Sequence, residues 1–238
     1  MSISPQPRLE NAGMDAWLVR LFDEIDERNM GWITALVRAC EQAFGERLID
    51  VVPSYTTVLV QFDALALDHG EARRLLQQLL AKLTPDADDE AAPVKELPVW
   101  YHPSVGPDMT RLEQNTGLNT DRLIELHSGH CYRVFALGFA PGFAFMGTLP
   151  AQLELPRLDS PRPRVPAGSV AIAGRQTAAY PKDSPGGWNL LGRTPARLFD
   201  LHRPGFSLLQ VGDRVRFVPV SKAEFERLGG DTTPMRES

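Results

Sequence analysis

The amino-acid sequence predicts an α+β protein with a mixed first half and an all-β second half. In the first hundred residues, apolar side chains alternate between strand and helix periodicity in the order β-α-β-β-α-β. Between residues 138 and 195, eight glycines and nine prolines fall among 58 residues, nearly twice their density in the whole chain. This density within apolar runs is typical of short strands joined by shaped turns. A mixed layer followed by a barrel or sandwich satisfies both patterns.

Length and composition are those of an ordinary soluble globular protein. The 238 residues suffice for one large domain or two small ones, and 43% of them are hydrophobic and 23% charged. A net charge of −5 argues against nucleic-acid binding. Because no secretory signal and no apolar run of the ~20 residues needed to span a bilayer is found, we expect a cytoplasmic protein without a nucleic-acid or membrane partner.

The charge is unevenly distributed. Residues 157–216 contain ten Lys and Arg against four Asp and Glu, a local net charge of +6, which leaves −11 for the remainder. A basic second half suits an anionic small molecule or an acidic protein surface. The arginines could equally be ordinary solvated side chains on a barrel.

The two cysteines predict neither a disulfide nor a metal site. Cys40 falls on the apolar stripe of a predicted helix, and Cys131 begins a predicted strand. Neither has the spacing or the neighbouring His and Cys residues of a zinc site. We expect buried, reduced thiols and no bound metal.

The first half begins with a polar segment, residues 1–12, that we expect to be frayed. The elements predicted after it are a strand at 16–22, a helix at 27–44, a hairpin of strands at 48–52 and 57–62, a helix at 69–83, an acidic loop at 84–93 and a strand at 97–101. This order is the split βαβ, or ferredoxin-like, pattern. It predicts a subdomain over residues 13–103, with two helices on one face of a four-stranded antiparallel sheet.

The second half opens with two short helices in a predicted bridge at residues 104–131. Asp108 is placed to cap the first helix, and Asn119 or Thr120 the second. The strands predicted after the bridge lie at 132–139, 169–173, 188–192, 196–200 and 214–220. They predict a barrel or sandwich domain over residues 132–222, followed by a flexible end at 223–238.

Searches for nucleotide and hydrolase motifs are negative. The sequence has no GxxxxGK[ST] phosphate loop, GxSxG elbow or HExxH pair. The GFAPGF segment at 138–143 is interpreted as an apolar turn because of its phenylalanines and proline. None of the five histidines has the Ser and acid neighbours of a triad, although His102 and His130 flank the junction between the halves. The catalytic residues are therefore left unknown.

Polar side chains gather in the loop from residue 176 to residue 194. The candidate substrate-binding residues are Gln176, Tyr180, Ser184, Gly186, Gly187, Trp188, Arg193 and Thr194. The turn at 185–188 can present backbone N–H groups to an anion, and the fork of Arg193 matches a carboxylate. Alternatively, Tyr180 and Trp188 are core aromatics and the other residues serve the turns.

Four segments carry a resemblance to a known family. They read GFAPGFAFMG, RVPAGSVAIAG, YPKDSPGGWNLLGRTPARLFD and GDRVRFVPVS. They resemble the B-type subunit of 5-oxoprolinase, in a family of carboxyltransferase C–D type domains. That family also includes a KipI-like inhibitor of a sporulation kinase, proteins labelled allophanate hydrolase subunit 1, and domains fused within urea amidolyase. The resemblance covers residues 16–221 and implies a ferredoxin-like subdomain followed by a cyclophilin-like β-barrel.

The resemblance implies one part of an ATP-dependent hydrolase that opens 5-oxo-L-proline to L-glutamate. It implies two partners, a C-type subunit with carboxyltransferase A–B type domains and an A-type subunit, and a chain that is inactive alone. ATP is used by the complex, at a site not located in this chain. Phosphorylation of the lactam oxygen would activate an unstrained amide. On this basis Arg193 and the backbone of 185–188 are hypothesised to hold an anion, while Gln176, Tyr180 and Ser184 orient it.

Two other functions of the family stay open. One is inhibition of a sensor histidine kinase, and the other is a carboxyltransferase or allophanate-hydrolase type of role with urea-derived amides as substrates. The segment WYHPS at 100–104 departs from the family, which usually has a Cys-Tyr pair followed by glycine. Tyr101 matches, whereas Trp100 replaces the thiol and His102-Pro103 replaces the glycines. If this strand end lines the site, substrate choice could differ.

Overall fold

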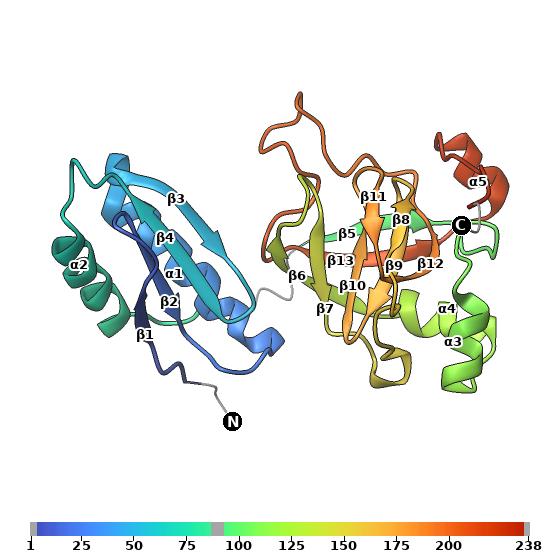
Figure 1. Cartoon of the computed structure of the whole chain (residues 1–238), viewed down its shortest axis with the longest axis horizontal. Coiled ribbons are helices and arrows are strands. Elements are labelled where there is room, and N and C mark those ends of the chain that lie inside the picture. Colours follow the sequence, from blue (N-terminus) through green and yellow to red (C-terminus); the bar gives the residue numbers. More distant parts are fainter. Residues whose placement is uncertain (1–3, 87–92, 236–238) are drawn as a thin grey trace. The chain divides into compact units, whose positions relative to one another are not determined.

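The computed structural model describes residues 4–86 and 93–235, which form two compact units (Figure 1). Unit 1 comprises residues 1–91 and unit 2 comprises residues 92–238. The predicted acidic loop at 84–93 lies mostly outside the described residues. Within the described part of the chain, no helix combines the length and the apolar character that a membrane span requires.

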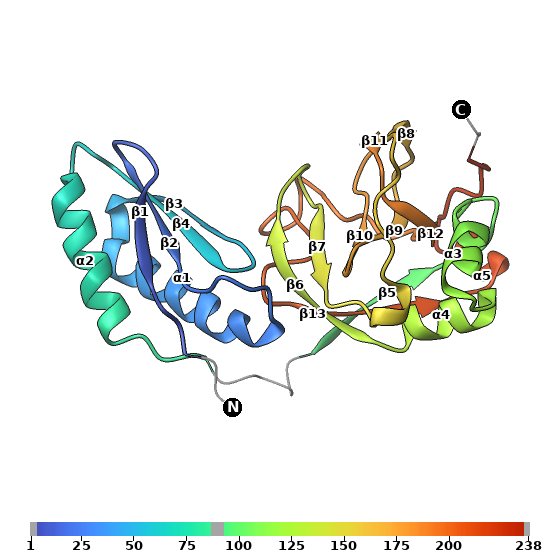
Figure 2. The same ribbon diagram turned by 60° about the horizontal axis from the view of Figure 1, so that its bottom comes forward.

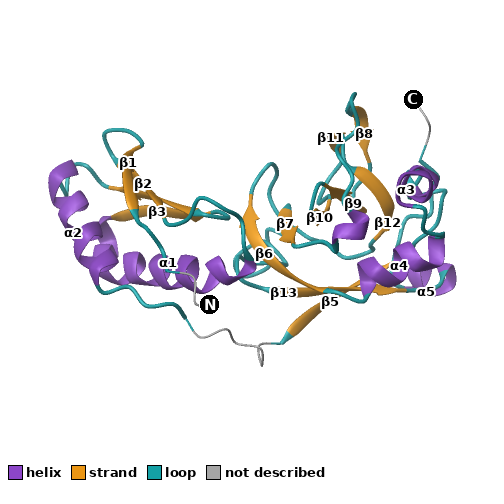
Figure 3. Ribbon diagram, turned by 90° about the horizontal axis from the view of Figure 1, so that it is seen from below, coloured by secondary structure: helices purple, strands orange, loops and turns teal. Residues whose placement is uncertain are grey.

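Unit 1 is a four-stranded antiparallel sheet with two helices on one face (Figure 3). The sheet order is β1-β2-β4-β3. Its strands are β1 (Arg8–Asn11), β2 (Ala16–Arg20), β3 (Leu48–Pro53) and β4 (Thr57–Phe62), and its helices are α1 (Met30–Phe44), preceded by the 3-10 turn η1 (Glu27–Asn29) and followed by the 3-10 turn η2 (Gly45–Arg47), and α2 (His69–Ala81). The predicted helices and hairpin are confirmed.

The helices of unit 1 form where apolar periodicity and end signals agree. In α1 the buried residues include Ile33, Leu36 and Cys40, at helical spacing, and Gly45 ends the helix with a φ of 54°. Helix α2 begins at a capping box, in which Asp68 accepts from backbone N–H groups of the first turn. Burial raises the pKa of the Cys40 thiol to about 12, so this cysteine stays protonated.

The fourth strand of unit 1 is a correction to the sequence prediction. The predicted strand at 97–101 is β5 (Val94–Val99), and it pairs in parallel with a strand of unit 2. Its Leu97 and Val99 are buried in the core of that unit. The edge of β2 is taken instead by β1, part of the segment predicted to be frayed. A ferredoxin-like subdomain over 13–103 is therefore not confirmed.

Unit 2 is built on a seven-stranded sheet in the order β12-β9-β10-β7-β6-β13-β5. Its further strands are β6 (Cys131–Leu137), β7 (Ala144–Gly147), β9 (Ser169–Ala173), β10 (Gln176–Ala179), β12 (Asn189–Arg193) and β13 (Arg214–Pro219). The residue after β5, Trp100, forms a bridge to Arg193 on β12. Because this bridge joins the two edges, the sheet is a nearly closed barrel, consistent with the cyclophilin-like fold.

A separate two-stranded ribbon projects beyond β9 and β10 (Figure 2). It consists of β8 (Arg162–Val165) and β11 (Ser184–Gly186). The segment predicted as a strand at 196–200 contributes only an isolated bridge between Phe199 and Ser207. Proline and glycine in the intervening segments explain why this half contains many short strands.

The helices of unit 2 correct two further predictions. Helices α3 (Met109–Thr116) and α4 (Thr120–Ser128) belong to unit 2, because Met109, Leu112 and Leu123 are buried in the barrel core together with the short turn η3 (Ala151–Leu153). They do not form a separate bridge at 104–131. The predicted flexible end at 223–238 contains α5 (Lys222–Arg227), whose Phe225 is fully buried beside Trp100.

Candidate functional site

The strands β9, β10 and β12 present two different faces. Val170 and Ile172 of β9 point into the barrel core, which we call the inner face. Ala171 and Ala173 alternate with them and belong to a second apolar cluster, which we call the outer face. That cluster consists of Phe143, Val165, Ala171, Ala173, Ala178, Tyr180, Trp188 and Leu190. The candidate residues of the 176–194 loop lie on or beside the outer face.

Aromatic side chains pack on the alanines of the outer face. The Phe143 ring lies 5.2 Å from the ring of Tyr180 and 5.8 Å from the ring of Trp188, both edge-on. The Arg157 guanidinium lies 5.7 Å from the Trp188 ring centre. A Cβ at Gly186 would lie 2.3 Å from the Tyr180 hydroxyl, so only glycine fits there. Tyr180 and Trp188 are thus parts of a packed aromatic layer.

Phe139 marks the rim of this layer with a strained backbone. Its φ is 66°, its side chain is 63% exposed, and its ring lies 5.1 Å from Phe143. A bulky residue in the left-handed region is a genuine outlier. Such strain persists where the surrounding structure holds it, commonly at functional sites.

Arg193 lies at the end of β12 with its side chain only 2% exposed. Its Nη1 donates to the carbonyl oxygens of Asp231 at 2.7 Å and Thr233 at 3.0 Å. Its Nε and Nη2 are buried and have no partner among the described residues. Burial lowers the pKa of Arg193, while the carboxylates of Asp231 and Asp183 raise it. An arginine stays charged, so two charged N–H positions are unused.

Two buried hydroxyls on the side of the outer-face cluster are also unused by the described residues. Ser169 is the direct partner of Arg193 across the β9–β12 ladder, and its Oγ has no hydrogen-bond partner within the described ranges. The Oγ of Ser184 is also buried without a hydrogen-bond partner among the described residues. Ser184 pairs with Val165 of the outer-face cluster, which places both side chains on the same side of the ribbon. An unpaired buried polar group costs about 1–3 kcal/mol, so these groups are suited to an external partner.

Other predicted site residues serve the fold. The Oγ1 of Thr194 accepts from the N–H of Ala196. The carbonyl oxygen of Gly187 accepts from Leu158, and the N–H of Trp188 donates to the Tyr180 hydroxyl. Within the turn at 185–188, these two backbone groups are therefore engaged by the turn's own neighbours.

Gln176 lies away from Arg193. On β9, Gln176 is paired with Ala173 whereas Arg193 is paired with Ser169. Four residues of strand separate these positions, which corresponds to roughly 13 Å at ~3.3 Å per residue. The two side chains therefore begin from widely separated backbone positions.

Asp108 takes a role different from the predicted helix cap. It makes no capping hydrogen bond to α3. Its carboxylate instead accepts from Arg162 at 2.7 Å and from the N–H of Leu190 at 2.7 Å, and it is nearly buried. This pair ties the β8–β11 ribbon to β12 beside the aromatic layer. Asn119, in contrast, caps α4 as predicted, accepting from the N–H of Arg122.

The inner face contains a paired polar chain that was not predicted. The fully buried His127 contacts the Tyr101 hydroxyl through Nδ1 at 2.7 Å and the Thr177 Oγ1 through Nε2 at 2.9 Å. Burial lowers its pKa to about 3, so the imidazole is neutral. The ring of His102, which flanks the predicted junction between the halves, stacks on the ring of Trp100 at 4.8 Å.

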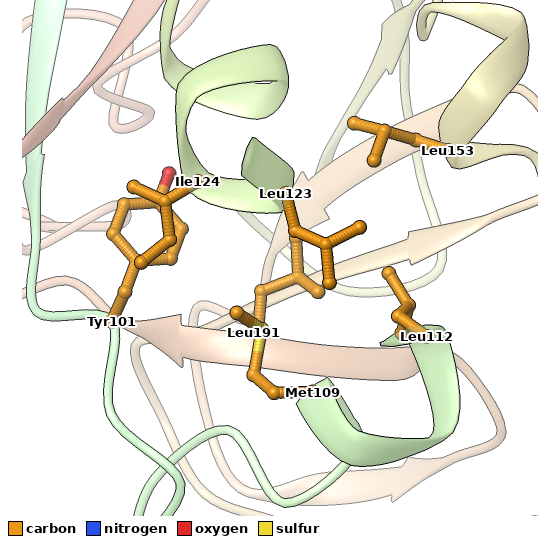
Figure 4. A pocket seen from close by; sticks show the side chains of 7 residues that line it. All are labelled: Tyr101, Met109, Leu112, Leu123, Ile124, Leu153 and Leu191. Atoms are coloured by element: carbon orange, nitrogen blue, oxygen red, sulfur yellow. The ribbon is translucent and has the colours of Figure 1, made fainter. Parts of the chain in front are cut away.

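A small apolar pocket of unit 2 is lined by residues of the barrel core (Figure 4). It is lined by Tyr101, Met109, Leu112, Leu123, Ile124, Leu153 and Leu191. Its single polar group, the Tyr101 hydroxyl, is engaged with His127. Among the described residues, no group of three His, Cys, Asp or Glu side chains could hold a metal ion.

Comparison with known proteins identifies the family. The family "Carboxyltransferase domain, subdomain C and D" matches residues 7–209. The chain belongs to this family. The B-type subunit of 5-oxoprolinase from Bacillus subtilis (strain 168) is 34% identical over 228 residues, covering 92% of this chain and 95% of that protein. The corresponding 5-oxoprolinase protein of Escherichia coli O157:H7, also a B-type subunit, is 41% identical over 175 residues, covering 72% of this chain and 78% of that protein.

Two solved structures share the fold of this chain. The crystal structure of TTHA0988 matches with a TM-score of 0.77 and 38% identity over 88% of this chain. The chain spans 40% of that protein's length. Urea carboxylase of Kluyveromyces lactis matches with a TM-score of 0.69 at 20% identity, over 94% of this chain and 22% of that one. This second likeness concerns the fold alone.

Proposed function

We propose that this chain is the B-type subunit of a 5-oxoprolinase complex, which opens 5-oxo-L-proline to L-glutamate. The observation that carries the proposal is the 34% identity with the Bacillus subtilis protein, which extends over nearly the full length of both chains. A protein named as a subunit works with others. We assign it two partners, an A-type subunit and a C-type subunit with carboxyltransferase A–B type domains, and no activity when alone.

The outer face of unit 2 has the groups that this substrate needs. The substrate carries one carboxylate on a small ring. Arg193 offers two unused N–H positions, and the fork of a guanidinium matches a carboxylate. The Ser169 hydroxyl, directly across the ladder, is the nearest additional donor that the register provides. Tyr180 and Trp188 supply an apolar wall for the ring. In this proposal the chain binds and orients the substrate.

The use of ATP belongs to the complex rather than to this chain. ATP would activate the lactam amide for hydrolysis. The turn at 185–188 is a poor fit for phosphates, because the Tyr180 hydroxyl lies directly over Gly186 and leaves no open space there. No ATP site and no catalytic base are assigned to this chain, and we propose that its partners complete the active site.

The test is release of glutamate from 5-oxo-L-proline by the reconstituted complex with ATP. The A-type and C-type partners are assayed with this chain, without it, and with a heat-denatured sample of it as the control. The proposal expects turnover only when the folded chain is present. Equal turnover without the chain would exclude it as a required part of the enzyme. Inhibition of a sensor histidine kinase by the chain, with no effect on glutamate release, would support the regulatory alternative.

A further inference from the structure

The segment after α5 crosses the outer face, and we call residues 230–235 the strap. The strap begins where the N–H of Gly230 donates to the carbonyl oxygen of Phe225. It passes over Arg193, which donates to the carbonyl oxygens of Asp231 and Thr233. It reaches the aromatic layer, where the side chain of Met235 packs against the outer-face cluster. The strap therefore contacts both the cation of the proposed substrate site and the apolar cluster to which the site's wall belongs.

The strap satisfies Arg193 only in part. Both carbonyl oxygens bind the same nitrogen, Nη1, and leave Nε and Nη2 buried without partners among the described residues. The Asp231 carboxylate is 3.7 Å from Nη1 and 69% exposed, so it makes no close ion pair. A free carboxylate can instead accept two parallel hydrogen bonds from a guanidinium. Arg193 thus has more bonding capacity than the strap uses.

Few interactions hold the strap in place. Its described residues form no strand, and its hydrogen bonds to the rest of the unit are those at Gly230, at Arg193 and between the N–H of Met235 and the carbonyl oxygen of Ser104. The hydrogen bond from the N–H of Thr233 to Asp231 is internal to the strap. Segments with few buried contacts open locally at low free energy.

We propose that the strap is a displaceable cover that holds Nη1 of Arg193 and closes off the unused Nε and Nη2, where the substrate carboxylate binds. The identity of the displacing ligand, 5-oxo-L-proline, rests on the proposed function, whereas the covering of Arg193 does not. Opening exposes the guanidinium, the Ser169 hydroxyl and the aromatic layer together. The substrate carboxylate reaches Nε and Nη2 only when the strap is open, so substrate binding is coupled to strap opening.

A reversible lock on the full-length chain tests the cover. The N–H of Met235 lies 2.7 Å from the carbonyl oxygen of Ser104, which brings the two backbones close enough for a disulfide in the variant Ser104→Cys/Met235→Cys. The readout is the rate at which phenylglyoxal modifies Arg193, mapped by mass spectrometry. The single variant Ser104→Cys, oxidised in the same way, is the control for the native Cys40 and Cys131.

The proposal expects modification of Arg193 to slow at least ~10-fold in the oxidised double variant and to recover on reduction. A chain that ends at Gly229, checked for folding by circular dichroism, is expected to react faster than the full chain. Equal rates in the oxidised and reduced double variant would overturn the proposal. If the disulfide does not form, the chain that ends at Gly229 provides the test. An unchanged rate of Arg193 modification in that chain would also contradict a cover.

Addition of 5-oxo-L-proline separates this inference from the proposed function. In the reduced chain, the ligand is expected to protect Arg193 from phenylglyoxal. If the disulfide slows modification of Arg193 but the ligand does not protect Arg193, the result would support the cover and contradict the proposed substrate. Protection that is unaffected by the lock would support the substrate and contradict the cover.

Discussion

The inner and outer faces of β9, β10 and β12 differ in whether their buried hydrogen-bond donors have partners. On the inner face, His127 has partners at both ring nitrogens, Tyr101 and Thr177. Asn189, on the same face, donates through Nδ2 and leaves only its acceptor Oδ1 unpaired among the described residues. On the outer face, Arg193 and Ser169 keep buried donors without partners in the described part of the chain. The two faces belong to the same strands and are separated by one layer of backbone. Satisfied polar groups stabilise a fold, and unsatisfied ones lower stability unless a ligand completes them.

The largest effect on stability is expected when the inner-face histidine is removed. His127→Phe fills the space but leaves the Tyr101 hydroxyl buried without its partner. We expect a loss of about 2–4 kcal/mol in the free energy of unfolding, measured with urea, from lost hydrogen bonds and an unpaired polar group. The exposed His202 provides the control variant His202→Phe. Comparable effects of the two substitutions would show that the inner chain is not structural.

Removal of the outer-face cation should affect turnover rather than stability. Arg193→Ala is expected to lower turnover of 5-oxo-L-proline by the complex at least ~10-fold, the equivalent of about 1.4 kcal/mol. The free energy of unfolding should fall by no more than about 1 kcal/mol. The substitution removes two stabilising hydrogen bonds, but it also removes two buried nitrogens whose lack of partners among the described residues is destabilising. Arg197→Ala, at an arginine whose side chain is 71% exposed, is the control. Unchanged kinetics in folded Arg193→Ala would reduce Arg193 to a structural residue.

The inner face also predicts how stability depends on pH. The pKa of His127 is about 3 when folded, against an ordinary value of 6.5. Between these values the unfolded chain binds a proton that the folded chain does not, so stability is fully present above pH 6.5 and falls as the pH decreases. Well below pH 6.5, His127 lowers the free energy of unfolding by up to about 1.4 kcal/mol, the equivalent of one tenfold change in proton concentration, for each unit that the pH decreases. Urea unfolding of the wild type and of His127→Phe at pH 7.5 and 5.5 measures it, and equal pH dependence would contradict a neutral buried imidazole.

The smallest expected effect concerns the strained rim of the outer face. Phe139→Gly removes a side chain that is 63% exposed at a φ of 66°. Because glycine adopts this conformation without penalty, we expect the free energy of unfolding to stay constant or to rise by up to about 1 kcal/mol. Leu201 is a control because it is apolar and 70% exposed but does not have a positive φ. The substitution Leu201→Gly should therefore destabilise the protein. A clear loss of stability in Phe139→Gly would show that the backbone is not strained there.

Local patterns in the sequence were sufficient for most elements of the fold. The spacing of Ile33, Leu36 and Cys40 predicts α1, and Asn119 predicts the start of α4. The pattern of Leu97 and Val99 predicts a strand as well, but not its partner. Strand pairing is a nonlocal choice between two sheets, and only burial in the tertiary core decides it.

The candidate site was predictable only where it depends on local sequence patterns. The fork of Arg193 stands out in a basic glycine-proline loop, and the alternative that Tyr180 and Trp188 pack as aromatics agrees with their burial. The backbone carbonyls that cover Arg193 have no sequence signature and come from a segment 38–40 residues away. An aspartate before a helix, such as Asp108, resembles a cap whether it caps or forms a buried ion pair.

The most direct test of an anion site on the outer face compares 5-oxo-L-proline with its carboxamide, which keeps the ring and loses the charge. The ratio of kcat/KM for glutamate formation from the acid to kcat/KM for opening of the amide is measured with the wild-type complex and with Arg193→Ala. If Arg193 holds the carboxylate, the wild type prefers the acid by at least ~10-fold, the strength of one charge-assisted contact, and the variant loses that preference. Full preference for the acid in the Arg193→Ala complex would contradict the account, because the carboxylate would then be recognised elsewhere.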